Sequence, residues 1–99
     1  MTVYEVLQDN KVLFSGKAIA VREWIEDKLM QSTLGFYPML QENEEEEELE
    51  LYLHSEWAED LEEDEIEKVE KLGLNEFDSL KAIQHILNIT ICATRKEIN

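Results

Sequence analysis

The chain has 99 residues and a formal net charge of −15, with 24 acidic and 9 basic side chains. Its 43% hydrophobic content and single cysteine predict one folded domain, residues 1–99, without an intrachain disulfide. There is no leader pattern and no apolar run near the roughly 20 residues that a membrane span needs, and the excess of acid disfavours direct binding to nucleic acid or anionic membrane. We therefore expect a soluble, cytoplasmic protein.

The negative charge is concentrated in an interior acidic window, residues 42–70. This window contains 16 of the acidic residues and one basic residue, Lys68. The other 70 residues contain eight acidic and eight basic side chains, so they carry no net charge. Repulsion among the acids opposes compactness, and acidic blocks without a structural role are usually terminal tails.

The chain before the window predicts a β-hairpin followed by a helix. In residues 2–15, β-branched and aromatic residues flank the turn signal Asp9-Asn10-Lys11. Residues 17–31 have apolar side chains at helical spacing, namely Ala18, Val21, Ile25 and Leu29. The solvent-facing side of this helix is expected to carry the charged residues Arg22, Glu23, Glu26, Asp27 and Lys28.

A short apolar connection, residues 33–40, separates this helix from the acidic window. Gly35 and Pro38 prevent the helix from continuing through it. The stretch Phe36–Leu40 is apolar, and two interpretations remain open for it. It lies as a loop over the core, or it is an exposed anchor for a partner protein.

The first half of the window predicts a strand. Leu49, Leu51 and Leu53 alternate with polar residues, which is the pattern of a half-buried strand with its leucines inward. Residues 42–48 are compatible with a solvated loop. If the strand continues backwards, its outer face carries Glu44, Glu46, Glu48 and Glu50.

The second half predicts two short helices. Ser55 is a candidate N-cap, and Gly73 with Leu74 has the pattern of a helix stop. On a helical wheel one sector is acidic, but Glu65 falls among the apolar residues. We therefore expect residues 56–72 to break near 62–65. The acidic sector contains Glu56, Glu59, Asp60, Glu63, Glu67 and Glu70.

The remainder predicts one more helix and a last strand. Asn75 is the candidate cap of a helix whose inner side contains Phe77, Leu80, Ile83 and Leu87. Residues 89–95 alternate as a strand in which Cys92 is expected to be buried or half-buried. The predicted fold is α+β in the order ββα-βααβ, a mostly antiparallel four-stranded sheet with helices on one face.

The sequence has no recognisable parts of an enzyme or a metal site. It contains no phosphate-binding, dinucleotide-binding, nucleophile-elbow or zinc-protease motif. His54 and His85 lie in different predicted elements. An EF-hand loop needs an internal glycine, and none lies between Gly35 and Gly73. We predict no catalytic residue, no cofactor and no metal site.

The remaining chemistry is recognition of a basic surface. Carboxylates on a strand or a helix repeat about every 5–7 Å, so an ordered array of them can take the place of backbone phosphates. The alternative is that the acids only form a solvated face. The predicted partner-binding residues are Glu44, Glu46, Glu48, Glu50, Tyr52, Glu56, Glu59, Asp60, Glu63, Asp64 and Glu67.

The first residues carry a resemblance to known proteins. Tyr4-Glu5-Val6, Asn10, the run Val12–Gly16 and the helix after it resemble short phage and mobile-element proteins of low-GC Gram-positive bacteria. In those proteins the helix can lead into a helix-turn-helix, but the segment Thr33–Pro38 departs from that pattern. A DNA-reading role therefore does not carry over.

With its acidic window the chain is similar to the DNA-mimic class of phage inhibitors, which includes many anti-CRISPR proteins. This resemblance implies a phage-encoded inhibitor, acting in the bacterial host cytoplasm. It would block the basic nucleic-acid site of a host defence nuclease, above all a CRISPR-Cas effector. The alternative is a small regulatory or assembly partner that binds through Phe36–Leu40, with the acids serving solubility only.

Overall fold

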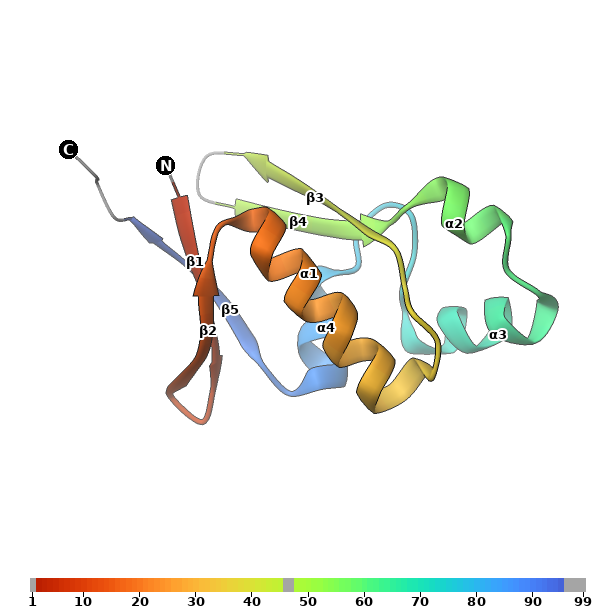
Figure 1. The fold of residues 1–99 in the computed structure, drawn as a ribbon, viewed down its shortest axis with the longest axis horizontal. Coiled ribbons are helices and arrows are strands. Elements are labelled where there is room, and N and C mark those ends of the chain that lie inside the picture. The colour runs from red at the N-terminus through yellow and green to blue at the C-terminus, as the bar shows by residue number, and fades with distance from the viewer. Residues whose placement is uncertain (1, 46–47, 96–99) are drawn as a thin grey trace.

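The computed structural model describes residues 2–45 and 48–95, which form a small α+β domain (Figure 1). One sheet contains three antiparallel strands, β1 (Thr2–Gln8), β2 (Lys11–Gly16) and β5 (Thr90–Arg95), in the order β2-β1-β5. The predicted first hairpin is confirmed. Its turn residues Asp9 and Asn10 have φ of 52° and 66°, as in the type I′ turns that match strand twist.

A second sheet contains only β3 (Leu40–Glu45) and β4 (Glu48–Leu53), which pair antiparallel. The prediction of one four-stranded sheet is therefore wrong, because the strands divide between two sheets. Residues 42–48 were compatible with a solvated loop, but residues 42–45 belong to β3, which pairs with β4. Local pairing of this kind closes a shorter loop than pairing with β1 or β5 does, so its entropic cost is smaller.

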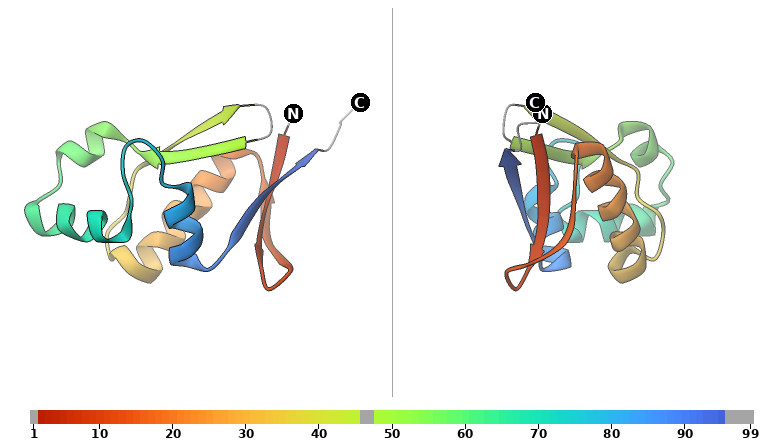
Figure 2. Two further views of the ribbon diagram at one scale, coloured as in Figure 1. Left: turned by 180° about the vertical axis from the view of Figure 1, so that it is seen from behind. Right: turned by 60° about the vertical axis from the view of Figure 1, so that its left-hand side comes forward.

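Four α-helices lie in the described part of the chain: α1 (Ala18–Leu29), α2 (Ser55–Glu59), α3 (Glu63–Leu72) and α4 (Leu80–Leu87). A π-helical turn, η1 (Met30–Leu34), extends α1. Helices α1 and α4 cover the same face of the three-stranded sheet, and the β3–β4 hairpin lies across them (Figure 2). Helices α2 and α3 form the far end of the 48 Å long axis. No helix among the described residues is long and apolar enough to cross a membrane.

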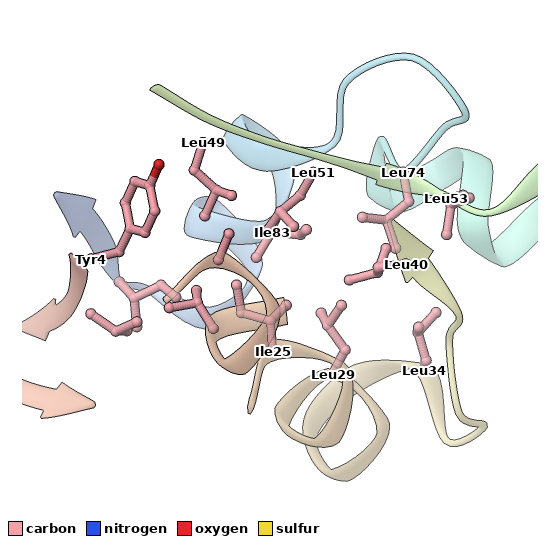
Figure 3. Close-up of a cluster of buried hydrophobic side chains, with 14 of the residues drawn as sticks. Tyr4, Ile25, Leu29, Leu34, Leu40, Leu49, Leu51, Leu53, Leu74 and Ile83 are labelled. Carbon is pink, nitrogen blue, oxygen red and sulfur yellow. The ribbon is translucent and has the colours of Figure 1, made fainter. Parts of the chain in front are cut away.

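The core lies where α1, α4, β1 and the β3–β4 hairpin meet (Figure 3). The three leucines of β4 point into it, as predicted from their alternation. The predicted stripe of the first helix is buried too. The residues of these two groups are Leu49, Leu51, Leu53, Ala18, Val21, Ile25 and Leu29.

The chain breaks between α2 and α3, close to the predicted position. The predicted stop at the end of α3 is confirmed as a Schellman motif. Gly73 has φ of 84° and donates its N–H to Glu70 O at 3.0 Å, and Leu74 N donates to Val69 O at 3.2 Å. The chain can turn sharply here because glycine adopts the left-handed conformation without a Cβ clash.

Two predictions about helix starts are wrong. Ser55 is the first residue of α2, and its predicted capping role belongs to His54, whose Nδ1 accepts from Glu56 N at 3.2 Å. Helix α4 begins at Leu80, so Phe77 precedes it and is 86% exposed rather than on its inner side. Asn75 caps a local turn instead of this helix, because its side-chain oxygen accepts from residues two and three positions on.

The expected burial of Cys92 is wrong as well. Strand β5 is an edge strand, and Cys92 pairs with Glu5 on the sheet face opposite to the buried side chains of Tyr4 and Val6. No described helix covers that face (Figure 2). The small thiol is therefore exposed.

Candidate interaction surface

The acidic residues of α2 and α3 lie together at one end of the molecule (Figure 1). Helices α2 and α3 are short, and residues three or four positions apart on a helix have side chains about 5–6 Å apart. Exposed carboxylates therefore follow one another along both helices. The exposed members of the predicted set at this end are Glu56, Glu59, Asp60, Glu63, Asp64 and Glu67.

These carboxylates have few cationic partners. Of the described acids of α2 and α3, Glu67 alone has an ion pair, with Lys71 at 3.5 Å across exposed side chains. Lys68 is engaged elsewhere: its Nζ donates to Leu34 O at 2.6 Å and lies 5.8 Å from the centroid of the Phe36 ring. The charge at this end is thus largely uncompensated within the molecule.

Two acids at this end have a structural role that explains their positions. Glu62 is the N-cap of α3, and its side chain accepts from the N–H of Glu65 while the Glu65 carboxylate accepts from Glu62 N at 3.0 Å. This reciprocal capping box satisfies two helix N–H groups. Acids in the first turn also interact favourably with the helix dipole, which offsets part of their mutual repulsion.

An aromatic stack fixes α2 against the connection after η1. The Phe36 and Trp57 rings are stacked with centroids 5.9 Å apart. In the apolar stretch Phe36–Leu40, Pro38 and Leu40 are buried, while Tyr37 and Met39 are 50% and 46% exposed. Much of this stretch therefore packs on the core, in accord with the first of its two interpretations, and two side chains remain at the surface.

The strand residues of the predicted set do not form one outer face. Register pairs Glu44 with Leu49 and Asn43 with Glu50, so Glu44 shares the leucine side of the hairpin and Glu50 lies on the other side. The expectation that Glu44 shares a face with Glu50 is wrong, because the acids before β4 belong to a separate, paired strand. The Glu44 side chain is nevertheless exposed. Tyr52 is half-buried on the Glu50 side. Glu46 lies outside the described residues. Glu48 is the first residue of β4, and its backbone alone is described.

Sequence reasoning missed an ionic cluster around a buried glutamate. Glu26, expected on the solvent face of α1, is 3% exposed. It accepts from Arg22 Nη1 at 2.9 Å, from Leu40 N at 2.7 Å and from Tyr37 O–H at 3.2 Å. Arg22 Nε also pairs with Glu42 at 2.5 Å. Arg22 and Glu26 are four positions apart on a helix, and this spacing was a sequence signal for the ion pair.

This cluster joins α1 to the start of β3. Burial lowers the pKa of Arg22, but the carboxylates of Glu26 and Glu42 raise it more, so its pKa lies above the ordinary value. A paired guanidinium of this kind stays charged at all physiological pH values. Glu42 and Glu26 are therefore structural acids that hold the acidic hairpin on the core.

Tyr4 forms a second contact between the hairpin and the three-stranded sheet. Its side chain is 1% exposed and its hydroxyl makes no hydrogen bond of standard geometry among the described residues. Burial, followed by the nearby negative charge of Glu44, raises the pKa of Tyr4 to about 12. The neutral phenol is thus favoured in the folded protein.

This arrangement predicts a loss of stability at alkaline pH. Between pH 10 and about 12 the unfolded chain releases the Tyr4 proton and the folded chain retains it, so the free energy of unfolding falls as pH rises. Urea denaturation at pH 9 and pH 11 measures the fall, and Tyr4→Phe should reduce it. An unchanged fall in Tyr4→Phe would contradict this assignment.

The chemistry of this surface is that of an anion array. Among the described residues, no group of three or more His, Cys, Asp or Glu side chains is arranged to hold a metal ion. Comparison of the chain with models of protein families, with curated proteins and with solved structures found no match. The function is therefore inferred from the sequence and the geometry of the chain itself.

Proposed function

We propose that this protein is an inhibitor that uses the exposed carboxylates of α2 and α3 as a nucleic-acid mimic. It occupies the basic nucleic-acid-binding site of another protein. One observation carries the proposal: the acids at this end are exposed, ordered on helices and largely without cationic partners. Such charge is costly to the folded chain, so we assign it a role in recognition.

The structure also supports separating structural acids from interacting ones. Glu26, Glu42, Glu62 and Glu65 are used inside the fold, in the ionic cluster and the capping box. The interacting residues we propose are the exposed acids that remain of the predicted set, including Glu50 on β4. A basic channel built to bind regularly spaced phosphates can accept these carboxylates, with release of the same counterions.

As the target we propose a CRISPR effector nuclease, with this protein as a phage-encoded inhibitor acting in the host cytoplasm. Such nucleases present a positively charged channel for the heteroduplex and arginines that read the short DNA motif beside the target. This choice is supported by the resemblance of the acidic sequence window to DNA-mimic inhibitors and by the opposite charges of the acid array and such a channel.

A charge-reversal experiment tests the proposal. Glu59→Lys/Asp60→Lys places lysines at the C-terminal end of α2, where the helix dipole favours cations, so the fold should be retained. Inhibition of DNA binding and cleavage is measured with a purified, guide-loaded Cas9-type nuclease. The half-inhibitory concentration is expected to rise at least about tenfold, since two charged contacts become repulsive.

The matched control has the same change in charge at another place. Glu23→Lys/Asp27→Lys also removes two negative charges and adds two positive ones, on exposed positions of α1 outside the acidic window. Its half-inhibitory concentration should stay within about twofold of the parent protein. Equal losses in both variants would show that only net charge matters, and full inhibition by Glu59→Lys/Asp60→Lys would contradict the proposed surface.

A further inference from the structure

An apolar groove lies within the acidic end of the molecule. It has a volume of about 290 Å³ and is bounded by α2, α3, the end of β4 and the connection from α3 to α4. Two of its residues are well exposed, Ile66 at 38% and Phe77 at 86%. Its apolar lining includes Leu53, Leu61, Ile66, Val69, Leu74 and Phe77.

The exposed ring of Phe77 is carried by an ordered turn. Asn75 Oδ1 accepts from Phe77 N at 2.7 Å and from Asp78 N at 2.8 Å, and Asn75 Nδ2 donates to Asp78 O at 3.0 Å. Buried Ser79 donates its Oγ hydrogen to Asn75 O at 2.9 Å and accepts from Asn75 N at 2.8 Å. The turn is thus closed by side-chain hydrogen bonds at both of its ends.

The same turn is fastened to the core strand β4. Leu53 N donates to Asn75 O at 2.8 Å, and Ser79 N donates to Leu51 O at 2.7 Å. Both leucines are buried. The backbone that presents Phe77 is therefore ordered before any partner arrives, which lowers the entropic cost of binding. Aromatic side chains, Phe included, are enriched at protein interfaces relative to the rest of the surface.

The charge around the groove restricts what can occupy it. Glu70 and Glu76 line it, and two of its walls are α2 and α3, the helices that carry the exposed acids at this end of the molecule. A second copy of this chain would bring another net charge of −15 to this rim. Nucleic acid and anionic lipid would be repelled in the same way. The complementary occupant is a cationic protein segment with an apolar side chain.

We propose that this groove binds an apolar side chain of a basic peptide segment in the partner protein, with Phe77 packing against that side chain. The inference rests on the proposed function, and it adds an apolar centre to the electrostatic interface. Nucleic-acid mimicry by charge alone selects any basic surface. The groove would select basic segments that carry a leucine or a similar residue between their Lys and Arg side chains.

Two synthetic peptides test the groove. One fluorescein-labelled peptide has a leucine between two Lys-Arg-Lys triplets, and the other has alanine at that position. Dissociation constants are measured by fluorescence anisotropy with the full chain at 50 and 150 mM salt. The leucine peptide should bind about tenfold more tightly than the alanine peptide, which is the effect expected from burial of a leucine side chain.

Variants locate the contact. Phe77→Ser should abolish the preference for leucine, and Ile66→Ser should reduce it. Both side chains are exposed, so the fold should be retained. Val12→Ser is the matched control, because Val12 is 51% exposed on β2, in the other sheet. It should leave the preference unchanged.

The other outcomes separate the two proposals. Equal binding of both peptides, weakened by Glu59→Lys/Asp60→Lys and unaffected by Phe77→Ser, would overturn the groove and leave the acidic surface intact. Binding of neither peptide at 50 mM salt would overturn recognition of basic segments itself. A leucine preference that persists in Phe77→Ser, or a dimer in sedimentation experiments that Phe77→Ser abolishes, would also overturn the proposed occupant.

Discussion

Glu26→Ala is expected to lower the free energy of unfolding by about 3 kcal/mol, the low end of the cost of removing one partner of a buried ion pair, because Glu26 is 3% exposed but Arg22 is 18% exposed. The substitution removes the acceptor of Leu40 N and leaves Arg22 with the carboxylate of Glu42 and the exposed, more distant carboxylate of Glu23. It also creates space next to buried core residues. Urea denaturation followed by far-UV circular dichroism measures the effect.

Two variants at α1 serve as controls for this prediction. Glu23→Ala removes a carboxylate that is 3.8 Å from Arg22 and 64% exposed, so its cost should be below about 0.5 kcal/mol. Glu26→Gln keeps an oxygen for Leu40 N and should cost less than Glu26→Ala. If Glu26→Ala and Glu23→Ala had the same small effect, the cluster would not contribute to joining β3 to α1.

The local features of the fold were predictable from short sequence patterns. Asp9-Asn10 tolerate positive φ, and the structure uses both residues in the hairpin turn. The alternation of leucines gives the inward face of β4, and Gly73 ends α3. In each case the cause is contained in a few neighbouring residues, so no knowledge of distant contacts was needed.

The features that were not predictable depend on distant partners. Glutamate is depleted in strands, so residues 42–45 suggested a loop, yet Arg22 on α1 neutralises Glu42 and allows β3 to lie on the core. Phe77 falls on the apolar side of a helical wheel, but the hydrogen bonds of Asn75 form a turn there and delay the helix to Leu80. In both places tertiary contacts outweigh local periodicity.

The same distinction applies to the candidate surface. The sequence located the acidic window and the break between its two helices, but it treated the acids of the window as one array. The structure divides them into a hairpin part and a helical part, and it places Glu44 and Glu50 on opposite sides of the hairpin. The apolar groove had no sequence signal, since its walls come from β4, α2, α3 and the turn at Asn75.

Binding of the protein to the guide-loaded nuclease is expected to weaken about a hundredfold when salt rises from 50 to 200 mM. Proteins that contact 6–10 DNA phosphates lose about 10³–10⁵ in affinity over this range. Duplex DNA carries one charge per about 1.7 Å of helix axis and a condensed counterion atmosphere. Two short acidic helices have a lower charge density, so fewer counterions are released per contact. Titrations by biolayer interferometry at five salt concentrations give the slope of log K against log salt.

The slope distinguishes electrostatic contacts from apolar ones at the same interface. Glu59→Lys/Asp60→Lys should make the slope shallower by about 1–2, because each lost charged contact reduces it by about 1. Phe77→Ser should weaken binding at every salt concentration and leave the slope unchanged, since burial of an aromatic ring releases no counterions. A salt-independent affinity in the parent protein would contradict nucleic-acid mimicry. That result would indicate that the protein binds its partner through exposed apolar side chains such as Tyr37 and Met39.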